Sequence, residues 1–226
     1  MDLESGSQGE EPRPLTDEEL LLDALENGLY QRTMSHCRAI ARAVDSKAGY
    51  FPGHSDGVAY LVQLIARELG VGRGMLRRLQ VASLLHDTGK LKIPDRILLA
   101  PRKLTQEEYD VMKQHSVWSS EIASSISGFD KDIAIWIRHH HESWDGSGYP
   151  DGLAGEAIPW QSRLMLVADA FHVMTAHRPY QDARSRSEAI AEIIANSGTQ
   201  FDPRFVDAIM TRPAIQRLDF DRYEAR

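Results

Sequence analysis

Apolar residues recur along most of this chain with the spacing of an α-helix. The clearest run comprises Val58, Leu61, Val62, Ile65 and Leu69. This i, i+3, i+4, i+7 spacing is that of one buried helix face, and Gly70 directly after it is a typical helix stop. We find no alternation typical of strands. The pattern therefore predicts an all-α fold.

Capping residues mark where further helices begin. Thr105 and Glu108 form a capping-box pattern. Asp130 can cap the next helix, which we expect to present His140 and His141 on its apolar side. Other helices are expected over residues 15–47, 75–87 and 162–176, from Ser187, and after the cap and first-turn proline Asp202-Pro203.

The same pattern divides the chain into three parts. Residues 1–14 are polar and are expected to form a disordered tail. Residues 15–46 form an N-terminal helical segment, and residues 47–226 form one domain. Within it, residues 143–160 break into glycine and proline turns. Irregular loops of this length are uncommon in compact domains, so this one is a functional candidate.

Composition narrows the chemistry. The 226 residues carry a net charge of −7, which argues against a nucleic-acid polymer as partner. No apolar run is long enough to span a membrane and no signal peptide is present, so we expect a cytoplasmic protein. The single cysteine leaves histidine and carboxylate as the ligands for any metal.

Several acidic and histidine side chains fall on buried positions. Asp169 lies inside the apolar run LMLVADAF, where an isolated ionised carboxylate would cost several kcal/mol. A metal ion would offset that cost, although a hydrogen-bonded polar core network is the alternative. The other members of this set are the helix-end pair His86-Asp87, His115 on a helix stripe, and the adjacent His140 and His141.

These residues lie in strings that resemble a known family. HDTGK at 86–90, HHESWDGSGYP at 140–150 and ADAFHVMTAHRPY at 168–180 resemble the HD-GYP subgroup of the HD phosphohydrolase superfamily, whose members hydrolyse cyclic di-GMP. The resemblance covers roughly residues 28–210 and implies a helical-bundle HD domain with an irregular GYP loop. It also implies two divalent ions, iron or manganese, with a bridging hydroxide as nucleophile.

The resemblance assigns a role to individual residues. One metal would be held by His54, His86, Asp87 and Asp169, and the other by His115, His140 and His141, with Asp87 bridging. Lys90 would serve catalysis and bind substrate together with Arg178 and Tyr149. Gly148, Tyr149 and Pro150 look too rigid and exposed to be catalytic themselves. Asp145 would orient a ligand histidine or simply cap a turn.

Five positions depart from the family pattern. Tyr50 replaces a glutamate that supports a third metal in some members, so we expect two ions. His172 replaces an aspartate, and we consider it a hydrogen-bond donor behind the ligands or a spectator rather than an extra ligand. The remaining departures are Ala48 for aspartate, Gly57 for a frequent arginine, and Gln181 for a substrate-binding lysine.

The leading hypothesis is a phosphodiesterase that opens cyclic di-GMP to pGpG and onward to GMP. The alternatives are a hydrolase of another cyclic dinucleotide, and a catalytically weak effector that binds a cyclic dinucleotide or a protein, as Gln181, His172 and Ala48 suggest. The family implies partner proteins with GGDEF or receiver domains. We expect residues 15–44 to pack on their own domain, with formation of a homodimer as the alternative.

Overall fold

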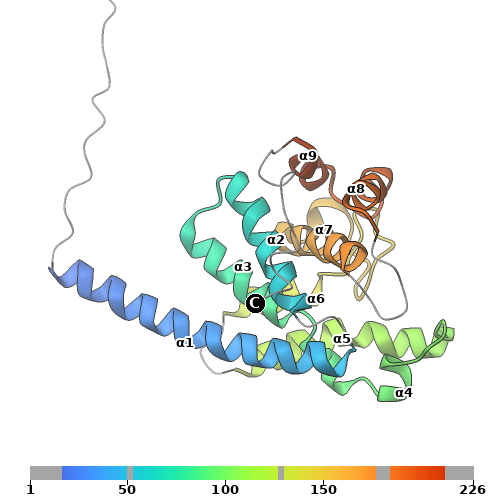
Figure 1. Ribbon diagram of the computed structural model, residues 1–226, viewed down its shortest axis with the longest axis horizontal. Coiled ribbons are helices and arrows are strands. Elements are labelled where there is room, and N and C mark those ends of the chain that lie inside the picture. The colour runs from blue at the N-terminus through green and yellow to red at the C-terminus, as the bar shows by residue number, and fades with distance from the viewer. Residues whose placement is uncertain (1–16, 50–52, 127–129, 177–183, 212–226) are drawn as a thin grey trace, which may run out of the picture. The chain divides into compact units, whose positions relative to one another are not determined.

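The computed structural model describes residues 17–49, 53–126, 130–176 and 184–211. These residues form helices and connecting loops, with one isolated bridge between Ser197 and Phe201 and no strand among them. The all-α prediction is confirmed for this part of the chain (Figure 1). The helices are α1 (Asp17–Lys47), α2 (His54–Glu68), α3 (Arg73–Leu85), α4 (Asp95–Leu98), α5 (Gln106–Ser125), α6 (Lys131–Arg138), α7 (Trp160–Thr175), α8 (Arg186–Ala195) and α9 (Pro203–Thr211), with short 3₁₀ helices η1 (Thr88–Lys92) and η2 (Gly155–Ala157).

Two compact units divide the chain, Met1–His36 and Cys37–Arg226. The described part of the first is the N-terminal portion of α1, where Leu25 and Leu29 are exposed. The second holds the rest of α1 and every other described helix. The predicted division between residues 46 and 47 stays a prediction, and the predicted tail over residues 1–14 lies outside the described residues.

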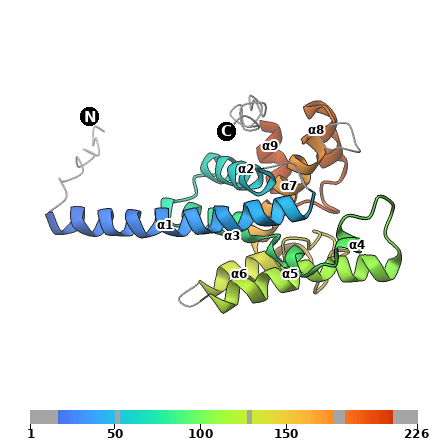
Figure 2. The ribbon, with the colours of Figure 1, turned by 60° about the horizontal axis from the view of Figure 1, so that its bottom comes forward.

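The core of the second unit is built around α2. This helix packs against α3 on one side and α7 on another, while α5 packs on η1 and α6 (Figure 2). Val62, Ile65, Leu79, Ile137 and Leu164 are fully buried between these helices. Two of them, Val62 and Ile65, belong to the apolar run that predicted α2. Removing one such side chain typically costs 2–5 kcal/mol, so this packing fixes the ends of the helices that carry the polar cluster.

Most predicted helices are present, but their ends differ. The capping box of α5 is confirmed, because the Glu108 amide donates to Thr105 Oγ1 at 3.3 Å and the Thr105 amide donates to Glu108 at 3.0 Å. The helix capped by Asp130 ends at Arg138, so His140 and His141 lie in the following turn and not on the helix. The last short helix before α9 is capped by Ser185 and not opened by Ser187.

The segment 143–160 is irregular as predicted, apart from η2 and the first residue of α7. Its Tyr149-Pro150 peptide bond is cis. Among the helices of the described residues, none combines the length and apolar character that crossing a membrane requires.

Candidate metal centre

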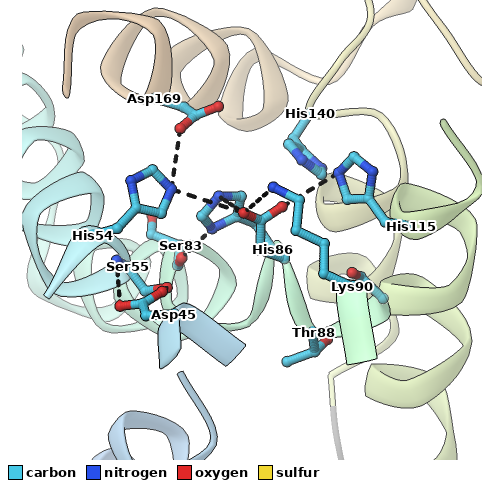
Figure 3. Close-up of polar contacts among 12 residues, drawn as sticks. Asp45, His54, Ser55, Ser83, His86, Thr88, Lys90, His115, His140 and Asp169 are labelled. Carbon is cyan, nitrogen blue, oxygen red and sulfur yellow. Dashed lines mark hydrogen bonds and ion pairs between the residues drawn. The ribbon is translucent and has the colours of Figure 1, made fainter. Parts of the chain in front are cut away.

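Five helices bring the predicted ligands together, at their ends or on their faces. His54 is the first residue of α2, and His86 and Asp87 directly follow α3. Figure 3 shows the side chains of His54 and His86 converging with those of His115 from α5, His140 from the turn after α6, and Asp169 from α7. Each element belongs to the packed core, so the cluster is held by the fold itself.

Asp87 lies at the centre of this cluster and is 2% exposed. Its Oδ2 atom lies 3.5 Å from His86 Nε2 and 3.8 Å from His54 Nε2. Its Oδ1 atom lies 3.3 Å from His115 Nε2. The two carboxylate oxygens thus face opposite halves of the cluster, which is the arrangement that a ligand shared by two ions requires.

Three of the histidines are oriented by the backbone of their own turn. The Nδ1 atoms of His86, His115 and His140 lie 2.6, 2.8 and 2.5 Å from the carbonyl oxygens of the residues three positions earlier. A carbonyl can only accept, so each Nδ1 carries the hydrogen and each Nε2 is a bare acceptor. Neutral imidazole with a bare nitrogen is the form that binds metal.

Three potential ligand atoms of the cluster lack a hydrogen-bond partner within the described part of the chain. His86 Nε2, His140 Nε2 and Asp87 Oδ1 are buried and have no hydrogen-bond partner among the described residues. Buried polar atoms are normally satisfied, and leaving one unpaired costs about 1–3 kcal/mol. Three such atoms in one cluster indicate that a group outside the polypeptide is meant to occupy it.

The donor set fits two metal ions. His54, His86 and Asp87 offer ligand atoms within 4.8 Å of one another, and so do Asp87, His115, His140 and His141. Asp169 Oδ1 adjoins the first group, 3.4 Å from His54 Nε2. Nitrogen and carboxylate ligands suit first-row transition metals, including the expected iron and manganese.

The group of Asp87, His115, His140 and His141 shows a further sign that its members can bind one ion. His141 Nε2 lies 3.1 Å from His115 Nε2. Two ligands about 2.1 Å from one ion lie roughly 3 Å apart.

Tyr149 of the GYP loop contacts His141 in two ways. Its ring stacks on the imidazole, with centroids 4.8 Å apart, and its backbone amide donates to the His141 carbonyl at 3.2 Å. The GYP loop, expected to be exposed, is half-buried against a candidate ligand.

The electrostatics of the cluster keep its ligands in their binding forms. Burial holds the pKa of His54, His140 and His141 well below the usual value. Burial raises the pKa of the Asp87 carboxyl, but the Lys90 ammonium and His86 outweigh it and hold that pKa well below its usual range. Neutral imidazoles around an ionised carboxylate are therefore present at neutral pH.

Metal-free protein is expected to lose stability on acidification. Burial, with Lys90 nearby, lowers the pKa of His115 from 6.5 to about 4. The unfolded chain binds this proton more tightly, so the contribution of His115 is complete above pH 6.5 and is lost as pH falls towards 4. That loss is about 3 kcal/mol. Denaturant unfolding in a chelator across this range measures it, and His115→Gln should flatten the dependence. An unchanged slope in this variant would contradict the prediction.

Lys90 is the one predicted catalytic cation within the described cluster. The residue is 7% exposed, and its ammonium donates to Asp87 Oδ2 at 2.5 Å. The helix predicted over residues 75–87 ends at Leu85, and the 3₁₀ helix η1 positions Lys90. Arg178, Tyr50 and Gln181 lie outside the described residues. Asp145 is exposed and accepts from the amide and hydroxyl of Ser147, so it caps a turn, the second of its two predicted roles.

Two buried carboxylates in the site's framework were not identified from the sequence. Asp45 accepts from the amide of Ser55 at 3.2 Å and from its hydroxyl at 2.7 Å, and so caps α2 beside His54. Glu142 follows the histidine pair, is 0% exposed, and accepts from three consecutive amides of the GYP loop. The sequence did contain a signal for Glu142, because a glutamate follows His140-His141 directly and precedes a run of turn residues. Asp151, whose amide donates to Glu142, forms an ion pair with Arg138. The carboxylates of Glu142 and Asp151 therefore have structural roles.

Glu142→Ala is expected to destabilise the protein by about 3 kcal/mol. The change leaves the amides of Asp151, Gly152 and Leu153 without their acceptor, and each unsatisfied amide costs about 1 kcal/mol or more. Thermal or denaturant unfolding measures the loss. Glu156→Ala removes an exposed glutamate of the same loop and should change stability by less than about 0.5 kcal/mol. Equal effects of the two changes would contradict this role.

The chain is similar to known proteins over most of its length. A family model described as HD domain matches residues 32–205. The chain is 38% identical over 211 residues, 93% of its length, to the cyclic di-GMP phosphodiesterase response regulator RpfG of Xanthomonas campestris, of which it covers 56%. It is 39% identical over 160 residues, 71% of its length, to 3′3′-cGAMP-specific phosphodiesterase 1 of Vibrio cholerae, of which it covers 37%. The chain thus spans about half or less of these relatives.

A solved structure shares the fold. The cyclic GMP-AMP phosphodiesterase V-cGAP3 of Vibrio cholerae aligns with a TM-score of 0.66 at 22% identity, covering 84% of this chain and 52% of that one. An HDG"Y"P protein of Bdellovibrio bacteriovorus, Bd1817, aligns with a TM-score of 0.59 at 16% identity, covering 81% and 61%. At these identities the alignments establish the helical architecture.

Proposed function

Because this chain belongs to the HD domain family, and its motifs match the HD-GYP branch, we propose that it is a metal-dependent phosphodiesterase for cyclic dinucleotides. The observation that carries the proposal is the position of Asp87, which is shared by two groups of buried ligand atoms. A dinuclear centre is suited to a phosphodiester, because two ions can stabilise both the attacking and the leaving oxygen.

The residues of the chain would hold the two ions as follows. His54, His86 and Asp169 would bind one, and His115, His140 and His141 the other, with Asp87 between them. Divalent ions held there would lower the pKa of a nearby water and neutralise charge on the phosphoryl oxygens. Hydrolysis of cyclic di-GMP would break one bond between phosphorus and a 3′ oxygen, giving pGpG.

Lys90 would assist the leaving group. Its ammonium is buried beside Asp87, so it is held in place and has few water molecules to compete with a ligand oxygen. A charge-assisted hydrogen bond from this group to a phosphate or to the departing 3′ oxygen would stabilise negative charge that develops as the bond breaks. Tyr149, stacked on His141, would line the groove through which the dinucleotide reaches the ions.

Cyclic di-GMP is the proposed substrate, with 3′3′-cGAMP as the nearest alternative. Relatives of similar identity carry either name, 35% to 44% for cyclic di-GMP and 34% to 39% for 3′3′-cGAMP. Both molecules have two phosphodiester bonds within a closed ring and differ in one base. The metal centre treats the bonds alike, so residues away from it must discriminate between the bases.

The test is turnover of a panel of cyclic dinucleotides by purified protein reconstituted anaerobically with iron or manganese. Release of pGpG from cyclic di-GMP is the expected result, and faster cleavage of 3′3′-cGAMP would instead support the alternative substrate. Absence of turnover with two bound ions would refute the proposed activity, and tight binding without turnover would support an effector role. Replacing both His86 and Asp87 by alanine should abolish hydrolysis.

A further inference from the structure

His172 contacts the candidate ligand His54 on the side of its ring that faces away from the proposed metal centre. It lies on α7, one turn after Asp169, and its Nδ1 atom is 3.1 Å from Nδ1 of His54. The two rings meet nearly edge to face, with centroids 5.1 Å apart. We infer that His172 is a positioning residue that fixes the tautomer and orientation of His54, and that Gly57 provides the space for it. The inference rests on the proposed metal centre.

His54 needs such a partner because of its place in the fold. His86, His115 and His140 each direct Nδ1 to a carbonyl oxygen three residues earlier. His54 stands at the first position of α2, so no turn of that helix precedes it. The contact to His172, 118 residues further along the chain, takes the place of the local carbonyl.

The position of the proton follows from the geometry. His54 Nε2 lies 3.4 Å from Asp169 Oδ1 and 3.8 Å from Asp87 Oδ2, and is therefore the nitrogen that faces the metal centre. A ligand nitrogen must be unprotonated, so the hydrogen of neutral His54 lies on Nδ1. His54 Nδ1 then donates to His172 Nδ1, and His172 carries its own hydrogen on Nε2. Under this inference His172 accepts this hydrogen bond, whereas from the sequence we considered it a donor.

Gly57 makes this contact possible. A Cβ atom added at Gly57 would lie 2.1 Å from Nε2 and 2.4 Å from Cδ2 of His172, far inside contact distance. Gly57 occupies the interior of α2, where glycine is less favourable than alanine. A larger side chain would push the His172 ring off His54. Two departures from the family pattern, at positions 57 and 172, are therefore one structural unit.

The test measures binding of Mn²⁺ to metal-free protein by electron paramagnetic resonance. His172→Leu keeps an apolar side chain but removes the acceptor. It should weaken the affinity for one of the two Mn²⁺ ions by about 10–100-fold, while the other ion binds as before. His172→Asp keeps an acceptor oxygen and should bind both ions within about threefold of wild type. In metal-free protein, long-range ¹H–¹⁵N spectra should show His54 protonated on Nδ1, and a mixture of tautomers in His172→Leu.

Gly57→Ala gives an independent test that alters neither imidazole. It should weaken the affinity for the same ion as His172→Leu does. The double variant should bind that ion no more weakly than either single variant, because both changes remove the same contact between His54 and His172. Unfolding in a chelator should show Gly57→Ala to be no less stable than wild type. Gly74→Ala in α3, where no atom lies within 4 Å of the added Cβ, is the matched control and should leave both ions unaffected.

The outcomes separate this inference from the proposed function. Wild-type affinity for both ions in His172→Leu and Gly57→Ala would overturn the inference alone. Equal weakening by His172→Asp and His172→Leu would also overturn it, since the acceptor would then be irrelevant. A wild-type chain that binds no Mn²⁺ would refute both proposals together. Two bound ions without hydrolysis of any cyclic dinucleotide would refute only the activity, and the titrations would still decide the role of His172.

Discussion

Asp87→Asn is expected to remove both metal ions and to lower kcat/KM for the cyclic dinucleotide by about 1000-fold or more. Asp87 contributes to both groups of ligand atoms, so its loss weakens the two ions together. Each ion supplies several kcal/mol of charge stabilisation, and 1.36 kcal/mol corresponds to a tenfold change in rate. Metal content after dialysis and steady-state kinetics measure the two effects.

A matched control distinguishes ligation from a general effect of charge. Asp145→Asn removes the same charge from an exposed turn in which the carboxylate accepts from Ser147. It should keep both ions and wild-type turnover. Circular dichroism should show that Asp87→Asn remains helical. Retention of two ions by Asp87→Asn would exclude a shared carboxylate at this position.

Gly89→Ala is expected to destabilise the protein by about 3 kcal/mol or more and to disrupt the metal centre. Gly89 lies between Asp87 and Lys90, where η1 crosses α5. A Cβ atom there would lie 2.0 Å from the backbone oxygen of His115 and 2.7 Å from the amide nitrogen of Ser119. Both obstacles are helix backbone, which cannot rotate away as a side chain can, so α5 and His115 must move.

Denaturant unfolding and Mn²⁺ binding measure this effect. Gly74→Ala again serves as the control, since its added methyl group meets open space and should be neutral or stabilising. Retention of wild-type stability in Gly89→Ala would mean that the close approach of η1 to α5 is not required. The glycine of the HDTGK string therefore has a steric explanation in addition to its place in the motif.

The sequence predicted the helices better than their ends. The apolar face of α2 and the capping box of α5 depend on local residues, and both predictions are confirmed except at Leu69, which directly follows α2 and is exposed. The apolar pattern continues through His140 and His141, so it gave no sign that α6 ends at Arg138. That end depends on where the two imidazoles must lie relative to α3 and α5, which is tertiary information. Pairing of Gly57 with His172 was equally out of reach, because the two residues lie on different helices.

The candidate ligands themselves came from burial patterns and the family resemblance, which the HD domain match supports. Their assignment to two ions stays a prediction, and the geometry of Asp87 is compatible with it. The resemblance did not reveal Asp45 or Glu142, because neither faces the cluster. Each acts by holding a backbone segment, the start of α2 or the GYP loop, in the position from which ligands project.

The way the histidines are oriented also bears on the order in which the site is assembled. The bonds that orient His86, His115 and His140 span three residues and can form with the local turn. The bond that orients His54 spans 118 residues and needs α2 and α7 to dock. Contacts of short sequence separation form earlier and at lower entropic cost. We therefore expect His86, His115 and His140 to be oriented early in folding, and His54 to be oriented only once α2 and α7 have docked.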